Sequence, residues 1–240
     1  MRNPIPILVF ASLSLTPATA ATAAERSVAI GSFDRVRVDA PIAVRIATNA
    51  SPSARISGDD DAIEAVDVRL NGTTLTIGRR SGAWQERPGT AAASAPVSVT
   101  LATGSLAGVT VIGAGTVTAG MMKANRVDLS VSGPGTIAVA AIDADQASAT
   151  VIGGGTVTVA GGRVRTARLT TNGPGTIDAD ALDAGEVAVR LDGPGDLRAR
   201  ARFTASVNST GTGRVAIAGS PKCQVRASAG GPVTCGAGTR

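Results

Sequence analysis

The sequence predicts an all-β protein: a right-handed parallel β-solenoid with coils of about 20 residues and irregular capping strands at its N-terminal end. A Gly-x-Gly corner recurs at even spacing, beginning at residues 113, 133, 153, 173 and 193, and again at 211. Apolar residues alternate with small or polar ones on both sides of each corner, which is typical of strands with one buried face. The chain has 3 Phe, 1 Trp and no Tyr, so its core must consist of Val, Ile, Leu and Ala. The period is too short for a propeller blade and fits one solenoid coil.

Residues 1–23 have the organisation of a secretory signal peptide. Arg2 precedes an apolar segment over residues 5–15, and small residues follow over 16–24. The apolar segment is shorter than the roughly 18 residues that a membrane-spanning helix needs. We expect cleavage after Ala20 or Ala23, which leaves a single domain over residues 24–240 and no transmembrane segment.

Residues 28–112 form the irregular opening strands of the predicted solenoid. Such strands are expected to cap one end, because an uncovered sheet edge invites pairing between molecules. Alternating or turn-bounded segments predict strands over residues 33–38, 42–46 and 97–101, and a hairpin over 66–77 about Asn71-Gly72.

Residues 78–96 break the strand pattern and contain the only Trp, Trp84. We interpret this segment as a flexible insertion. A binding loop on the rigid scaffold is the alternative.

Residues 113–220 are predicted to form the regular coils. In Gly133-Pro134-Gly135-Thr136, Pro suits the second position of a type II turn, and the second Gly supplies the positive φ of the third. Gly231-Pro232 lies one full period beyond Gly211, without a second Gly. The predicted structural turn residues are Gly113, Gly115, Gly133, Gly135, Gly153, Gly155, Gly173, Gly175, Gly193, Gly195, Gly211 and Gly213.

Stacking of the coils predicts that residues one period apart lie on top of one another. The charges agree, since Lys123, Asp143, Arg163 and Asp183 alternate in sign along one such column. By the same rule Asp178 and Asp180 lie beneath Arg198 and Arg200, and Thr116, Thr136, Thr156 and Thr176 form a column. Opposite charges on neighbouring strands stabilise a sheet, so these columns support the stacked fold without implying a function.

Cys223 and Cys235 are the two cysteines of the chain. Export places them in an oxidising compartment, so we expect a disulfide that closes a C-terminal cap over residues 221–240. The C-x-x-C spacing of a redox pair is absent.

Composition argues against most enzyme classes. The chain contains no His, which excludes His-based triads, His metal sites and His acid–base chemistry. The Gly-rich corners open no helical pattern, so they do not resemble nucleotide-binding loops. We expect no catalytic, cofactor-binding or metal-binding residues.

Several acidic residues keep an enzyme or metal site open as an alternative. Paired carboxylates or a calcium-holding Asp cluster serve polysaccharide lyases and hydrolases on β-helices. The candidates are Asp143 with Asp145, Asp178 with Asp180, Asp192 with Asp196, and the turn Asp59-Asp60-Asp61. We interpret the pairs as structural and the turn as solvated; the Thr-x-Thr pattern of ice-binding solenoids is interrupted at Ala138 and Asp178.

Charge is concentrated at the C-terminal end. Residues 190–240 carry a net charge of +6, whereas the rest of the mature chain is weakly acidic. Solubility and pairing along the columns explain much of this excess. As a functional hypothesis, Arg202, Arg214 and Arg226 contact anionic envelope glycans or lipopolysaccharide. Nucleic acid is not expected as a partner, because export separates the protein from it and interleaved aromatic residues are missing.

These motifs resemble the GIN-domain family, also described as the putative auto-transporter adhesin head domain, over residues 28–220. The resemblance rests on Phe33-x-x-Val36-x-Val38, Gly58-Asp59-Asp60, Leu75-Thr76-Ile77 and the Gly-x-Gly corners. The chain departs from the family in having Pro or another residue where many members have Ser inside the corner, and in its Cys-bearing C-terminus.

The resemblance implies a right-handed β-helix and an exported bacterial envelope protein without catalytic residues. We therefore expect a non-enzymatic surface binding or adhesion module that is periplasmic, outer-membrane-associated or extracellular. A polysaccharide-active β-helix enzyme, lyase or hydrolase, is the alternative.

Overall fold

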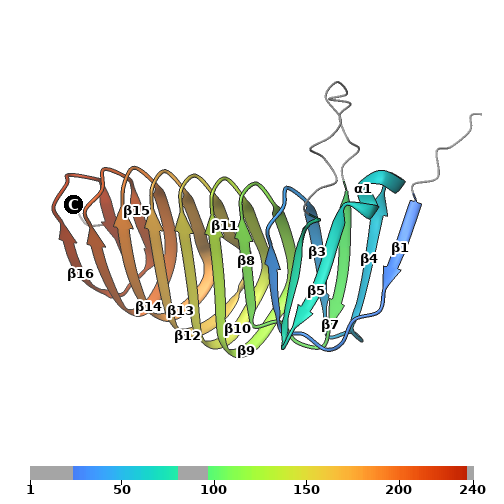
Figure 1. The fold of residues 1–240 in the computed structure, drawn as a ribbon. Coiled ribbons are helices and arrows are strands. Elements are labelled where there is room, and N and C mark those ends of the chain that lie inside the picture. Colours follow the sequence, from blue (N-terminus) through green and yellow to red (C-terminus); the bar gives the residue numbers. More distant parts are fainter. Residues whose placement is uncertain (1–23, 81–96, 237–240) are drawn as a thin grey trace, which may run out of the picture.

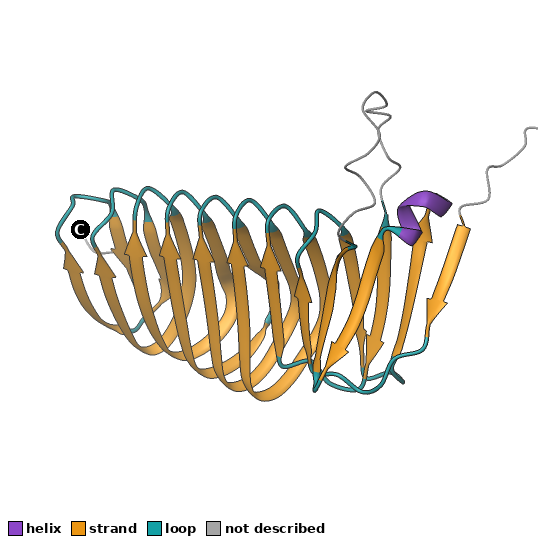
Figure 2. Ribbon diagram, viewed as in Figure 1, coloured by secondary structure: helices purple, strands orange, loops and turns teal. Residues whose placement is uncertain are grey.

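The protein is an almost entirely β-stranded solenoid whose coils stack along one axis (Figures 1 and 2). The computed structural model describes residues 24–80 and 97–236. The predicted parallel stack is confirmed, because Thr136 pairs with both Thr116 and Thr156 in the coils on either side. The strands are β1 (Ala24–Val28), β2 (Arg35–Val38), β3 (Ala43–Thr48), β4 (Ser53–Gly58), β5 (Val66–Asn71), β6 (Thr74–Arg79), β7 (Ser98–Thr103), β8 (Gly108–Ile112), β9 (Thr116–Ser132), β10 (Thr136–Ile152), β11 (Thr156–Val159), β12 (Gly162–Asn172), β13 (Thr176–Asp192), β14 (Asp196–Ser209), β15 (Val215–Gly219), β16 (Lys222–Ala227) and β17 (Val233–Cys235), with one short helix, α1 (Asp60–Glu64).

Each regular coil consists of three strand runs separated by bends. In β10, residues 136–139, 141–144 and 146–152 pair in parallel with the equivalent residues of β9, and the pairing lapses between these runs. We call them the first, second and third runs, counted from the corner. Each coil therefore contains a third strand run in addition to the two that flank the corner.

The core lies inside the coils as columns of stacked aliphatic side chains. The column that follows the corner in the first run is fully buried: Val117, Ile137, Val157, Ile177 and Leu197. The third run supplies two more buried columns, represented by Leu129 and Val131 in β9. Full burial of each such side chain contributes about 1.5–3 kcal/mol. The period-2 alternation thus identified the inward positions correctly.

The first and second glycines of each regular corner have roles opposite to those predicted. Positive φ occurs at the first glycine of the regular corners, with 102° at Gly133 and 112° at Gly173, but not at the second glycine, such as Gly135. A β-carbon on Gly135 would lie 2.7 Å from the carbonyl oxygen of Gly113 in the coil below. The second glycine is therefore required by close stacking of the coils, a constraint that turn preferences do not reveal.

The coils become shorter at the C-terminal end. Leu197 pairs with Val215, and Val215 pairs with Val233, so the spacing between equivalent residues is reduced in both of these steps. In this register Gly231 stacks on Gly213, so Gly231 takes the place of a second corner glycine. The alignment of Gly231 with Gly211 was wrong, because the shorter register continues into the last coil.

The first coil of the chain lies inside the stack and does not begin it. Strand β2 pairs in parallel with both β6 and β8, and β3 pairs in parallel with both β7 and β9. β6 and β7, later in the chain, therefore form the coil outside β2 and β3. The chain then crosses to the other side of the first coil and continues into the regular stack (Figure 1).

Antiparallel strands cover the N-terminal end. The predicted hairpin is confirmed as β5 and β6, with Gly72 at φ 59°. Next to β7 lies β4, which pairs antiparallel with it, and β1 pairs antiparallel with β4. Helix α1 connects β4 and β5 at this end (Figure 2).

Residues 1–23, predicted to be a signal peptide, and most of the 78–96 segment lie outside the described residues. Within 24–80 and 97–236, no helix is long and apolar enough to cross a membrane.

Candidate functional site

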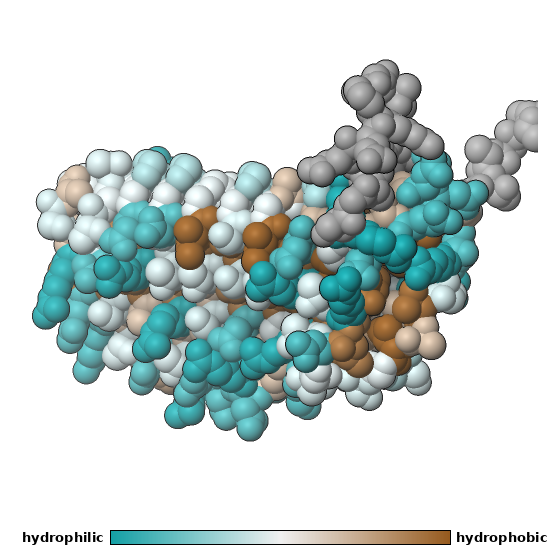
Figure 3. Space-filling model, in the orientation of Figure 1, coloured by the Kyte–Doolittle hydropathy of each residue, from teal (hydrophilic) through white to brown (hydrophobic). Residues whose placement is uncertain are grey.

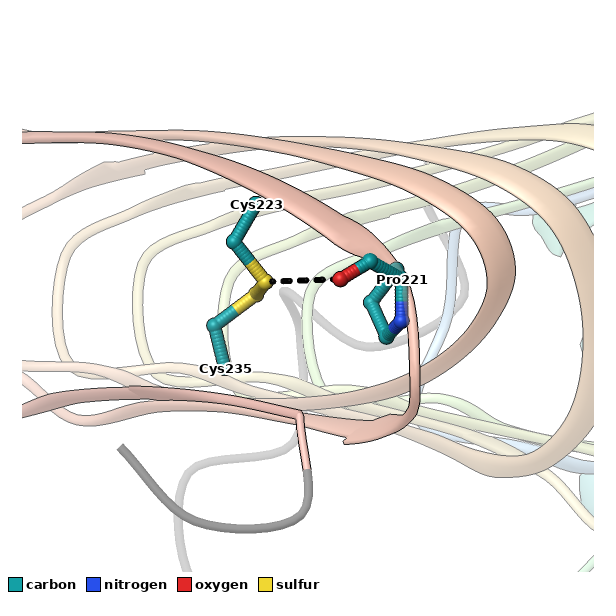
Figure 4. Close-up of a disulfide and its surroundings, with 3 residues drawn as sticks. All are labelled: Pro221, Cys223 and Cys235. Carbon is teal, nitrogen blue, oxygen red and sulfur yellow. Dashed lines mark hydrogen bonds between the residues drawn. A yellow bond between two sulfur atoms is a disulfide. The ribbon is translucent and has the colours of Figure 1, made fainter. Parts of the chain in front are cut away.

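The disulfide predicted between Cys223 and Cys235 is present and joins the two strands of the last coil. Cys223 comes from β16 and Cys235 from β17, and their α-carbons lie 6.3 Å apart. Figure 4 shows the bond crossing the interior of the coil. β16 pairs with β14 and β17 with β15, so the bond connects strands that do not pair with each other in the ladder. It closes the coil at the C-terminal end of the stack.

The three arginines proposed to contact anions lie on different runs of the coil. Arg202 follows the second-run part of β14 and forms an ion pair with Asp183, with a nitrogen–oxygen distance of 3.1 Å. Arg214 precedes β15, in the first run, and Arg226 lies in β16, in the third run. The structure does not bring the three side chains together in one patch.

Most of the acidic residues considered for catalysis are engaged with arginines of the neighbouring coil or strand. Asp180 lies 3.7 Å from Arg200, and Asp178 is in register with Arg198, as stacking predicted. Asp143 is in register with both Lys123 and Arg163. The alternating column of charges is confirmed.

Asp192 has a defined hydrogen-bond environment at the end of β13. It accepts hydrogen bonds from Thr210 Oγ1 and from Arg190 Nε, the latter at 2.9 Å. The Thr210 hydroxyl, followed by Arg190, lowers the pKa of the Asp192 carboxyl. Both partners favour its ionised form. Asp196, the residue considered as its catalytic partner, begins β14 in the first run.

The acidic turn at Asp59 leads directly into α1, with Asp60 and Asp61 in the first turn of that helix. In the described parts of the chain, no group of three or more metal-binding side chains is arranged around a common point.

A surface depression lies on the side of the solenoid at the bend between the second and third runs of β12, β13 and β14. Its volume is about 420 Å³. Successive coils line it: Asp143, Ala144, Arg163, Val164, Arg165, Gly185, Glu186, Arg202 and Phe203. We call this the β14 depression. The sequence singled out some of its charged residues as a column but did not predict a concavity.

A shift in strand register creates the β14 depression. Between β13 and β14 the pairing slips twice, at Ala179/Asp183 and at Ala184/Glu186. The β14 coil is shorter than those before it, so its bends cannot follow the bends of β13. Phe203 is thereby left 62% exposed beside Gly185. The reduced spacing between Gly193 and Gly211 was the available signal for this irregularity.

Arginine–aspartate pairs surround the β14 depression. Arg163 lies 3.6 Å from Asp143, and Arg165 lies 3.9 Å from Asp145. Arg202 contacts Asp183 and also lies over the ring of Phe203, 5.2 Å from its centroid. Because each arginine has an aspartate partner, positive charge does not accumulate in the depression.

The fold defines a class of protein: a parallel β-solenoid closed by antiparallel strands at its N-terminal end and by a disulfide at its C-terminal end. The chain belongs to the family described as "Putative auto-transporter adhesin, head GIN domain", whose model matches residues 32–221. The resemblance inferred from the sequence is thus confirmed, and the chain is an adhesion-type module. No match was found among curated proteins.

Solved structures share the fold at low sequence identity. A putative adhesin from Bacteroides fragilis has a TM-score of 0.74 at 18% identity, with 90% of this chain and 95% of that chain covered. A putative adhesin from Parabacteroides distasonis has a TM-score of 0.65 at 16% identity, with the same coverage. A protein named as a putative lipid binding protein from Parabacteroides distasonis has a TM-score of 0.62 at 18% identity, covering 91% of this chain and 96% of that chain.

Proposed function

We propose that the protein is an exported, non-enzymatic module of the bacterial envelope that acts in adhesion by binding glycans through its outer surface. The supporting observation is the regular array of polar side chains that stacking produces. In the third run, Thr110, Ser130, Thr150 and Thr170 are in register on successive strands, which places their side chains in one outward row. Rigid repetitive faces of this kind serve as extended binding surfaces in solenoid proteins.

The face seen in Figure 3 is a mixture of hydrophilic residues (teal) and residues of intermediate hydropathy (white), with separate hydrophobic groups (brown). Such a surface is better suited to binding hydrated polar partners than to docking an extended hydrophobic partner. Export follows from the signal peptide predicted over residues 1–23, and the disulfide of the last coil suits an oxidising compartment.

Anionic envelope glycans or lipopolysaccharide are the proposed partners of the C-terminal end. Lys222 and Arg226 lie in the exposed strand β16, opposite Thr204 and Asn208. Neither cation faces a carboxylate across this strand pair, in contrast to Arg202. Cations in this position are available to carboxylate or phosphate groups of a surface polymer.

Binding of the purified protein to isolated bacterial envelopes tests this function. The double substitution Lys222→Glu and Arg226→Glu is expected to weaken binding at low salt. Arg55→Glu with Arg69→Glu changes the net charge equally at the other end, on β4 and β5, and should leave binding intact. Equal loss in both variants would mean that only net charge matters. Chain cleavage of a uronate polymer by the unmodified protein would contradict the non-enzymatic assignment.

A further inference from the structure

The β14 depression differs from the rest of the solenoid in holding an exposed aromatic ring. Phe33 and Phe203 are the aromatic residues within 24–80 and 97–236; Phe33 is 3% exposed, whereas Phe203 is 62% exposed. Contact with water is unfavourable for a phenyl ring, and solenoid packing leaves most of Phe203 uncovered. Arg202 lies over the ring and restricts its orientation.

Gly185 forms the floor between Phe203 and Arg165. The equivalent positions of the preceding coils carry Asn125, Asp145 and Arg165. In this column of stacked residues, Gly185 is therefore the first position without a side chain. A β-carbon on Gly185 would lie 2.7 Å from the carbonyl oxygen of Arg165 and 3.5 Å from Phe203 Cδ2. The stacked backbone therefore requires glycine here, and its missing side chain leaves the concavity open.

The polar lining combines donors and acceptors at balanced charge. Arg163, Arg165 and Arg202 present guanidinium groups, while Asp143 and Glu186 present carboxylates. The three arginines are paired with Asp143, Asp145 and Asp183. A strongly anionic ligand would gain little from arginines already compensated and would be repelled by Glu186.

Uncharged sugars match this lining. Each sugar hydroxyl can donate to a carboxylate and accept from a guanidinium at the same time, which satisfies both side chains. The C–H face of a pyranose ring packs against an aromatic ring, as Phe203 would allow. Small-ligand sites combine apolar or aromatic side chains with convergent polar groups, and here Phe203, Val164 and Ala144 supply the apolar part.

From these observations we infer that the β14 depression binds an uncharged pyranose residue of a glycan, with Phe203 as the stacking platform and Arg165 and Glu186 as hydrogen-bonding partners. The inference deepens the proposed adhesive function, on which it rests. It locates a sugar site away from Lys222 and Arg226, and it assigns that site to neutral rather than anionic sugar units.

Binding of the purified full chain to immobilised oligosaccharides tests the inference. The probes are neutral hexose and N-acetylhexosamine oligosaccharides, with uronate-containing oligosaccharides for comparison. We expect the neutral probes to bind. Phe203→Ala should weaken that binding at least tenfold and Arg165→Gln about fivefold. Thermal unfolding should be nearly unchanged by Phe203→Ala, because the side chain is exposed.

Two further variants separate specific from general effects. Met121→Ala removes another exposed apolar side chain, 48% exposed, from the second run of β9, and should leave affinity within twofold. Glu186→Gln removes a negative charge and one acceptor. It should weaken binding of the neutral probes, whereas tighter binding of the uronate probes than of the neutral ones in this variant would indicate an anionic ligand and overturn the inference.

The outcomes distinguish this site from the proposed function. Unchanged affinity of Phe203→Ala for the neutral probes, or no binding of any neutral probe, overturns the inference. Binding restricted to uronate probes and lost with Lys222→Glu and Arg226→Glu also overturns it while supporting envelope adhesion. Binding of neutral probes through Phe203 supports the site even if envelope binding fails.

Discussion

Gly155 stacks on Gly135 so closely that a β-carbon added to Gly155 would lie 2.8 Å from the carbonyl oxygen of Gly135. Adjacent coils approach each other at the regular corners in this way, so the second corner glycine has no room for a side chain. The neighbouring Gly154 is different, because a β-carbon there would have its nearest contact at 4.0 Å, with Pro174 Cγ.

Gly155→Ala is therefore expected to lower the free energy of unfolding by about 2–3 kcal/mol, through overpacking between coils. Gly154→Ala should change it by less than about 0.5 kcal/mol. Urea unfolding of the two variants measures the difference. Equal stabilities would show that the corners open enough to admit a methyl group.

Thr171 offers a test of the buried polar groups. Its side chain is fully buried in a column with Val151 and Leu191, and within the described chain its Oγ1 has no hydrogen-bond partner. Thr171→Val should raise the free energy of unfolding by about 1 kcal/mol, because an unsatisfied hydroxyl is replaced by a methyl group.

Thr103→Val is the matched control for this change. The Thr103 hydroxyl is also buried, but it donates to the carbonyl oxygens of Phe33 and Ser105. Its removal should lower the free energy of unfolding by about 1–2 kcal/mol. Opposite signs in the two variants are expected; a loss for Thr171→Val would contradict the unsatisfied state of its hydroxyl.

Asp143 lies between Lys123 and Arg163 in the charge column. Asp143→Lys would place three cations on adjacent strands and should lower the free energy of unfolding by about 1–2 kcal/mol at low salt. Salt screens exposed charges, so urea unfolding at about 0.5 M salt should show a smaller loss. Asp143→Asn should cost about half as much, and a loss insensitive to salt would point to packing.

The pH dependence of stability tests the Asp192 environment. Its pKa is lowered in the folded state, so it stabilises the fold above the ordinary carboxyl pKa, and this contribution is lost as pH falls through the lower folded pKa. Asp192→Asn should cost about 0.5 kcal/mol at neutral pH, a value typical of an exposed pair. The difference from the unmodified protein should disappear in acid.

Thr210→Val checks the cause of this effect, because the Thr210 hydroxyl contributes most to the lowered pKa. An NMR titration of the Asp192 carboxyl in this variant should give a pKa closer to the ordinary value. An unchanged titration would assign the effect to Arg190 alone.

Much of the regular stack could be predicted because its information is local and repeated. The even spacing of the corners, the alternation about each corner and the Asn71-Gly72 turn describe short segments whose geometry depends on near neighbours. The charge column followed once the coils were stacked, and the disulfide followed from two cysteines in a chain expected to be exported. The roles of the corner glycines were reversed, because the second glycine is selected by the coil beneath it.

Two features required the folded chain. The β14 depression arises where the longer and the shorter coils meet, and its register shifts depend on how both backbones bend. Insertion of β2 and β3 between strands later in the chain is equally invisible to periodicity. Residue pattern specifies which faces of a strand are buried and how long a coil is. Which strand pairs with which depends on long-range hydrogen bonds between backbone groups. These groups are the same in every residue but proline, so the sequence does not label the partner of a strand, and only the folded chain decides the pairing.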